Sequence, residues 1–169
     1  MTERTLYKEG WERYPWWWVL GENVMTWVPW VIGFVVMWPL QVAGVPVASM
    51  GYALFILVTI GWLLKKHNCS TCVYYGKWCH LGWGKYAALI CKRDSGNPEI
   101  GAKLAVIYII LPLIPIVGAI AVTLMSGFSW TLLIAMVVFV AFNGLAFAVR
   151  PQACSRCKRR ATCPGSAAK

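Results

Sequence analysis

The sequence predicts an all-α integral membrane protein with four transmembrane helices, arranged as two tandem hairpins that are each followed by a cytoplasmic cysteine module. Composition is the first observation behind this fold class: 59% of the residues are hydrophobic and only 13% are charged, against about 25% charged in soluble domains. Two long stretches also carry no charged residue, and all sixteen basic residues lie outside them. Finally, a similar group of cysteines follows each stretch.

The two uncharged stretches predict two spans each. Residues 24–64 form a run of 41 residues, which is too long for one span of about 20 residues but suits two spans joined by a tight turn. Gly44 and Pro46 mark that turn. Residues 104–149 break in the same way at a Ser-Gly-Phe-Ser turn. We therefore expect spans at approximately 24–43, 46–64, 103–125 and 129–149.

Charge distribution predicts the orientation of these spans. Lys and Arg occur only before residue 24, between residues 65 and 103, and from residue 150 onward. Positive charge is retained in the cytoplasm, so both termini and the central loop are expected on the cytoplasmic side of a plasma or inner membrane. The first residues include several glutamates and no apolar core, so no cleavable signal peptide is expected. The expected segments are an N-terminal interfacial segment (1–23), transmembrane hairpin 1 (24–64), a Cys-rich loop (65–102), transmembrane hairpin 2 (103–149) and a Cys-rich tail (150–169).

A net charge of +10 is also typical of nucleic-acid-binding proteins. Here the basic residues lie only at the flanks of the predicted spans, which is the layout of residues that set membrane topology. We therefore expect the lipid bilayer as a partner, with contacts to anionic headgroups, and no nucleic acid.

The predicted spans carry few groups that could act chemically. They contain no charged residue or histidine in their interiors, which argues against pumps and proton-coupled carriers. His67 and His80 lie in the central loop, which excludes a haem held by two histidines between the helices. Asn143, inside the fourth span, is expected to form an interhelical hydrogen bond, and Pro112 and Pro115 are expected to kink the third helix.

The cysteines form two similar triplets, one after each predicted hairpin. The repeat distance from the first cysteine of one triplet to the first of the other is 85 residues, about half the chain. This pattern favours an internal duplication. Two hairpins of equal orientation would bring both triplets together at the cytoplasmic surface. The triplets have the spacings Cys-x2-Cys-x6-Cys and Cys-x2-Cys-x5-Cys, and their members are Cys69, Cys72, Cys79, Cys154, Cys157 and Cys163.

Clustered cysteines in a reducing compartment usually hold metal rather than form disulfides. Two Cys-x2-Cys pairs can supply the four thiolates of a tetrahedral zinc site, and the simplest such site joins Cys69 and Cys72 to Cys154 and Cys157. With Cys79 and Cys163 included, the spacing resembles the six-cysteine binuclear zinc cluster of certain fungal DNA-binding domains. That resemblance implies a coordination geometry for one or two zinc ions; it does not extend to DNA binding, because two spans separate the triplets.

Other fates of the six thiols remain open. Two Cys-x2-Cys pairs suit a [4Fe–4S] or [2Fe–2S] cluster equally well, and a cysteine followed by proline, as at Cys163, recurs among the ligands of such clusters. Unmetallated thiols, or disulfides in an inverted topology, are further alternatives. His67 and His80 are interpreted as surface or interfacial histidines rather than ligands, and Cys91 is interpreted as a buried or free thiol.

Three functional classes follow from these patterns. The favoured hypothesis is a non-catalytic membrane subunit whose cytoplasmic cysteine cluster binds zinc and docks a protein partner. Such a subunit could belong to a membrane enzyme complex. The second is an electron-transfer subunit with an iron–sulfur centre. The third is a membrane thiol-redox or soft-metal-handling protein. No catalytic triad, carboxylate pair or nucleotide-binding fingerprint occurs in the sequence, so no catalytic residue is expected.

Overall fold

Helices are the main regular structure of the chain in a computed structural model that describes residues 6–163 and 166–168. Within these ranges no β-strand forms, so the all-α prediction is confirmed. The elements, in chain order, are α1 (Trp16–Val36), α2 (Val47–Ile56), the π-helical segments η2 (Leu57–Leu63) and η3 (Lys65–Cys69), α3 (Trp83–Ile90), α4 (Pro98–Leu104), α5 (Ile107–Ile110), α6 (Leu113–Ser126) and α7 (Trp130–Ser155).

Four helical segments are long and apolar enough to cross a membrane, as predicted. The shortest has 21 residues and the longest 29, and both lengths exceed the minimum needed for the hydrocarbon core. The structure joins several elements into these segments, because α2 continues through η2 and η3, and α4 continues through α5 and α6. The segments are Trp16–Val36, Val47–Cys69, Pro98–Ser126 and Trp130–Ser155.

The first segment begins at Trp16, eight residues earlier than the sequence suggests. The predicted span starts after Glu22 because a charged residue is not expected inside it, but α1 contains the Glu22 carboxylate. This carboxylate has two partners: the Trp18 Nε1–H donates to it at 3.2 Å, and the His80 Nδ1 lies 3.2 Å from its second oxygen. Asn23 donates to the carbonyl of Leu81 at 3.1 Å. Buried polar groups must be hydrogen-bonded. Glu22 and Asn23 can therefore lie within α1 because His80 and Leu81, in a loop nearly sixty residues away, supply hydrogen-bond partners.

The second segment ends with two stretches of π-helix and extends past the predicted boundary at residue 64. π-Helical turns are rare and occur frequently at functional sites. Here they carry the chain from the apolar segment directly to Lys65 and Cys69.

The third and fourth segments are also longer than predicted. Asn97 caps the start of the third segment by accepting a hydrogen bond from the Glu99 N–H at 2.8 Å. This segment is interrupted just before Pro112, in agreement with the expected kink. The fourth segment continues past Pro151. Inside it, Asn143 donates to the carbonyl of Phe139 at 2.8 Å, on its own helix, where an interhelical bond was expected.

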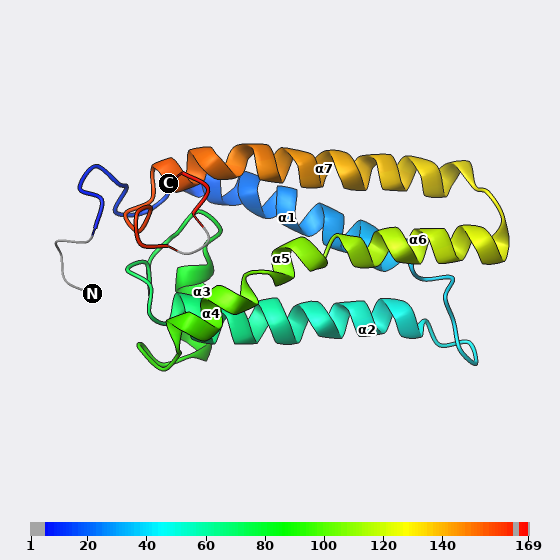
Figure 1. Cartoon of the computed structure of the whole chain (residues 1–169), viewed down its shortest axis with the longest axis horizontal. Coiled ribbons are helices and arrows are strands. Elements are labelled where there is room, and N and C mark those ends of the chain that lie inside the picture. Colours follow the sequence, from blue (N-terminus) through cyan, green and yellow to red (C-terminus); the bar gives the residue numbers. More distant parts are fainter. Residues whose placement is uncertain (1–5, 164–165, 169) are drawn as a thin grey trace.

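The two ends of the bundle hold different segments of the chain (Figure 1). The α1–α2 and α6–α7 connections lie at one end. The opposite end holds α3, α4 and the chain segments near both termini. All six cysteines of the two triplets belong to segments at this second end, because each triplet begins where a long helix finishes.

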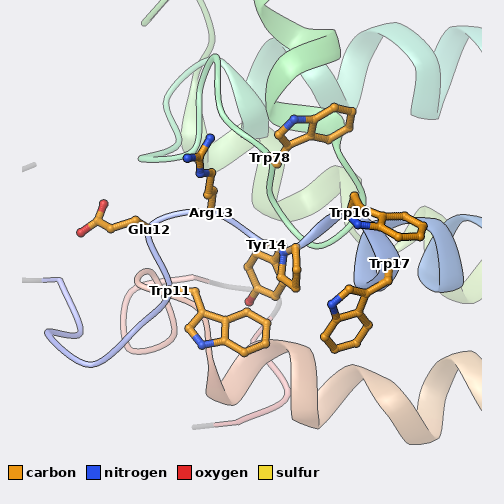
Figure 2. Close-up of a pocket in the computed structure, with 8 residues that line it drawn as sticks. Trp11, Glu12, Arg13, Tyr14, Trp16, Trp17 and Trp78 are labelled. Atoms are coloured by element: carbon orange, nitrogen blue, oxygen red, sulfur yellow. The ribbon is translucent and has the colours of Figure 1, made fainter.

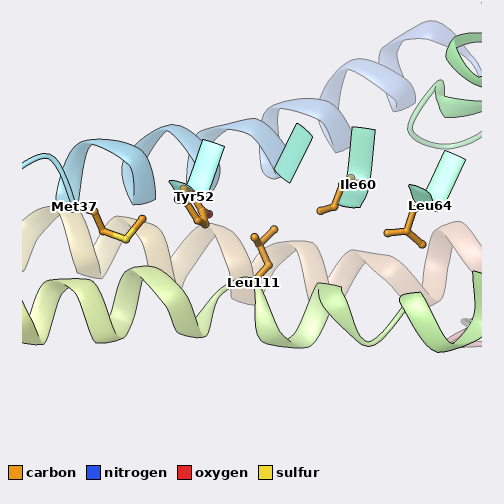
Figure 3. Close-up of a cluster of buried hydrophobic side chains, with 5 residues drawn as sticks. All are labelled: Met37, Tyr52, Ile60, Leu64 and Leu111. Carbon is orange, nitrogen blue, oxygen red and sulfur yellow. The ribbon is translucent and has the colours of Figure 1, made fainter. Parts of the chain in front are cut away.

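The bundle packs around α1, which contacts α2, α6 and, most extensively, α7. Figure 3 shows the main apolar core between α1, the second segment and the α5–α6 junction. Glycines permit the close approach of these helices. A Cβ on Gly33 would lie 2.6 Å from the Pro115 Cγ, and one on Gly118 would lie 2.5 Å from the Met37 Cγ. The buried core residues are Met37, Tyr52, Ile60, Leu64 and Leu111.

Candidate metal centre: a thiol-rich cap at one end of the bundle

Three segments distant in sequence form a single cap at the thiol-bearing end of the bundle: residues 7–15, 65–97 and 150–163. The first of these segments runs between the other two. The Tyr7 N–H donates to the Lys158 carbonyl at 2.8 Å, and the Trp11 N–H donates to the Arg156 carbonyl at 2.9 Å. The N-terminal segment, which the sequence assigned to the membrane interface, is therefore a structural part of the cap.

Two buried tyrosines join all three segments. The Tyr14 hydroxyl donates to the Ala153 carbonyl at 2.6 Å, while the Tyr14 N–H donates to the Trp78 carbonyl at 2.9 Å. The Tyr74 hydroxyl donates to the Trp11 carbonyl at 2.6 Å and accepts from the Lys158 N–H at 3.1 Å. Both tyrosines are only 2% exposed, and their ring centroids lie 5.9 Å apart.

The cap brings the six predicted ligand cysteines into one neighbourhood. Cys72, Cys79 and Cys157 pack against the apolar cluster that contains Tyr14 and Tyr74. The remaining three are electrostatic neighbours of these: Cys69 of Cys72 and Cys79, and both Cys154 and Cys163 of Cys157. All six are free thiols and partly exposed. Cys91 is not among the interacting thiols in the described part of the chain; its carbonyl accepts a hydrogen bond from the Tyr75 hydroxyl.

The thiols do not converge on one point. Among the residues that the structure describes, no three Cys, His, Asp or Glu side chains are arranged to hold a metal ion. Three of the thiols pack against the apolar cluster that contains the Tyr14 and Tyr74 rings. Coordination by four of the six thiols therefore requires these side chains to rearrange.

Two buried cations lie beside the thiols. Lys65 is 2% exposed and Arg159 is 9% exposed. The Lys65 Nζ lies 3.4 Å from the centroid of the Trp83 ring, and its titratable neighbours are the Cys69 and Cys79 thiols. Neither cation takes part in an ion pair with a carboxylate in the described ranges.

Arg159 faces the first triplet from the C-terminal tail. It hydrogen-bonds to the Cys72 thiol and is an electrostatic neighbour of Cys69. Its Nε is buried and has no hydrogen-bond partner in the described part of the chain. An unpartnered buried donor is costly, at about 1–3 kcal/mol. The chemistry of this donor set, two cations surrounded by thiols, fits a negatively charged metal–thiolate group.

Burial keeps the Cys72 and Cys157 thiols protonated in the absence of metal. It raises the pKa of the Cys157 thiol to about 11, although the Arg159 backbone N–H opposes this by hydrogen bonding to the thiolate. Burial also raises the pKa of Cys72, against the effects of the Tyr74 backbone N–H and of Arg159. Because only a thiolate binds metal, coordination here must release protons.

The two histidines beside the first triplet have structural partners. The His67 Nδ1 accepts a hydrogen bond from the Asn97 N–H at 3.0 Å, which ties the start of the third segment to η3. The His80 Nδ1 lies 3.2 Å from Glu22 on α1. Both histidines thus have partners within the protein, and their interpretation as surface or interfacial residues rather than ligands stays a prediction.

Sequence reasoning missed four residues of the cap: Tyr14, Tyr74, Lys65 and Arg159. Tyr14 lies in a run of aromatic residues that suggests a lipid-facing belt, and nothing in that run distinguishes the buried ring from the exposed ones. Lys65 and Arg159 each lie four or fewer residues from a triplet cysteine. A basic residue so close to a predicted thiolate site is the signal that could have identified these two.

The fold and the cap together define a four-span helical bundle with a thiol-rich end. Comparisons with protein-family models, with curated proteins and with solved structures found no match for this chain. Its function is therefore argued from the chemistry of the cap.

Proposed function

We propose that this chain is a non-catalytic integral membrane subunit whose cytoplasmic cap binds metal, preferably zinc, and docks a soluble protein partner. The single observation that carries the metal proposal is the pair of buried cations, Lys65 and Arg159, whose titratable neighbours are thiols. Buried charges are stable only when they are paired. Neutral thiols cannot pair them, whereas metal-bound thiolates can.

The charges balance in a simple way. Zinc bound by four thiolates carries a net charge of about −2, and the two buried cations supply the opposite charge. Cys69, Cys72, Cys154 and Cys157 form the simplest four-thiolate set, because each Cys-x2-Cys pair reaches one ion from a single turn. Cys79 and Cys163 allow a second ion.

A metal in the cap would also hold the bundle together. The first triplet follows the second span and the second triplet follows the fourth span. Coordination by one cysteine pair from each would link these two spans covalently through the metal. Structural zinc sites stabilise small folded units in this way.

The outer surface of the cap supports the docking proposal. The Arg156 guanidinium lies over the Trp11 and Trp18 rings, at 4.9 and 4.8 Å from their centroids. Arg160 lies 4.6 Å from the centroid of the Tyr7 ring. Guanidinium groups held on aromatic rings are pre-organised to bind carboxylates. An acidic surface on a soluble protein is therefore the expected partner.

Serine substitutions test the metal proposal. Cys69→Ser and Cys154→Ser each remove one thiolate of the simplest site, so we expect each variant to purify with at most about half of the wild-type metal content. The matched control is Cys91→Ser, which removes a thiol outside the interacting group and should leave the metal content unchanged. The measurement is elemental analysis of protein purified anaerobically in detergent, with circular dichroism to verify that the helices are retained.

The same samples distinguish zinc from the alternatives. Iron with acid-labile sulfide and an EPR signal on reduction would favour the iron–sulfur electron-transfer subunit. Labelling of Cys69 or Cys154 by thiol probes applied from outside the cell would favour a thiol-redox role in an inverted topology. Wild-type metal content in both serine variants would contradict the proposed site.

A further inference from the structure

A pocket lies where α1 begins. Its volume is about 720 Å³, and Figure 2 shows the side chains around it. Because α1 is the first of the four apolar segments, this pocket lies at the level where the first span meets the membrane surface. The lining residues are Trp11, Glu12, Arg13, Tyr14, Pro15, Trp16, Trp17 and Trp78.

The charged residues of the pocket lie on one side of it, and aromatic residues make up most of the remaining lining. Glu12 and Arg13 lie on the side away from α1, whereas Trp16 and Trp17 lie on the first turn of α1 (Figure 2). Polarity therefore changes along the direction from the cap to the apolar segment. An amphiphile in one leaflet of a bilayer changes polarity in the same direction, and indole rings favour this boundary.

The net charge facing the pocket is positive. Glu12 is already paired, since it accepts from Lys158 and lies 3.8 Å from the Lys77 Nζ. Arg13, in contrast, makes no hydrogen bond or ion pair with any other residue in the described ranges. Lys85 adds further positive charge, with its Nζ 4.9 Å from the centroid of the Trp78 ring.

The start of α1 adds to this positive potential. No side chain caps the helix, and its first turn contains no acidic residue. The unsatisfied N–H groups of a first turn and the helix dipole both favour an anion. Arg13 and the start of α1 thus form a subsite that can bind an anion, and the indole rings form an apolar subsite next to it.

We propose that this pocket binds an anionic phospholipid of the adjoining leaflet. Its phosphate is held by Arg13, and its glycerol and upper acyl chains lie against Trp16, Trp17 and Trp78. The inference rests on the membrane placement in the proposed function and is independent of the metal. The charge and shape of the pocket select an anionic lipid over a zwitterionic one, because Arg13 has no neighbouring free carboxylate to accept a choline or ethanolamine group.

Calorimetric titration of the full chain in an uncharged maltoside detergent tests the proposal. The probes are dihexanoyl phosphatidylglycerol, dihexanoyl phosphatidylcholine and inorganic phosphate, each below its aggregation concentration. Arg13→Gln is expected to weaken phosphatidylglycerol binding about tenfold, because it removes a charge-assisted hydrogen bond. Trp17→Ala is expected to weaken the same binding about three- to tenfold, through the loss of aromatic contact area.

Two control variants match these substitutions. Arg93→Gln makes the same change in charge at an exposed position outside the pocket. Trp62→Ala removes an indole of the same exposure as Trp17, 55% in each case, from the second segment. Both controls should bind phosphatidylglycerol within about twofold of wild type.

The three probes separate the possible outcomes. Phosphatidylglycerol binding that exceeds phosphatidylcholine binding and depends on Arg13 and Trp17 would support the lipid site. Equal binding of the two lipids, or no effect of Arg13→Gln, would overturn it. Inorganic phosphate bound as tightly as the lipid would also overturn it, in favour of a site for a soluble anion. None of these outcomes depends on metal content, so a metal-free preparation that binds the lipid would contradict only the proposed metal centre.

Discussion

Replacing Tyr14 with alanine is expected to destabilise the cap by about 3–5 kcal/mol, the range for loss of a large buried aromatic side chain. The Tyr14 ring is 2% exposed, contacts the Tyr74 ring and belongs to the apolar cluster against which three of the thiols pack. Its hydroxyl also joins the N-terminal segment to the end of α7 through the Ala153 carbonyl. Alanine at this position removes the buried ring and the side-chain hydrogen bond to α7, while the backbone hydrogen bond from Tyr14 to the Trp78 carbonyl is retained.

The rate of thiol alkylation in detergent measures this effect, because alkylation of the shielded thiols requires the cap to open locally. We expect faster modification of Cys72 and Cys157 in Tyr14→Ala, with the four apolar segments remaining helical by circular dichroism. Tyr14→Phe retains the ring and loses only the hydrogen bond, so its cost should be about 1 kcal/mol. Tyr86→Ala, at an exposed tyrosine of α3, is the control. Alkylation of Tyr14→Ala at the rate of this control would show that the tyrosine does not hold the cap together.

Replacing Lys65 with methionine is expected to weaken metal binding about 10- to 100-fold, as is typical for loss of a residue that supports metal ligands from outside the coordination sphere. Methionine is of similar length and apolar, so it fills the same space without the charge. The titratable neighbours of Lys65 are the Cys69 and Cys79 thiols. Without the Lys65 ammonium group, only one of the two buried cations remains to balance the negative charge of the metal-bound thiolates.

Competition with a chromophoric chelator measures the metal affinity of Lys65→Met. Lys66→Met is the matched control, because Lys66 is adjacent in sequence and partly exposed. The metal-free Lys65→Met protein should be at least as stable as wild type, since an uncompensated buried charge is removed. The opposite pattern, with unchanged metal affinity and a less stable metal-free protein, would indicate that Lys65 acts only by packing on Trp83.

The sequence predicts the number of spans because charge is costly in a membrane. Two uncharged stretches, each long enough for two helices, leave four as the consistent number, and the structure has four such segments. The ends of the segments depend on tertiary contacts that the sequence does not reveal. Glu22 lies within α1 because Trp18 and His80 satisfy its carboxylate, and one of these partners comes from a distant loop.

The cap was predictable only in part. The spacing of the cysteines indicates that the two triplets belong together, and the structure brings the six thiols into one neighbourhood. Their occupation by metal, the duplication of the two hairpins and the cytoplasmic orientation stay predictions. Sequence patterns do not reveal that Tyr14 is buried between the two triplets, because an aromatic residue next to tryptophans has the same pattern at a lipid interface as in a core.

The proposed role of the cap depends on whether its thiols bind metal. The decisive measurement is metal content by elemental analysis, with an absorption spectrum and a count of free thiols, on the full chain purified anaerobically in an uncharged detergent. We predict one or two zinc ions per chain, a colourless sample, and reaction of only about one to three of the seven cysteines with thiol reagents under native conditions, because bound thiolates are protected. Protein that contains no metal, and in which all the cysteines react freely, would contradict the account.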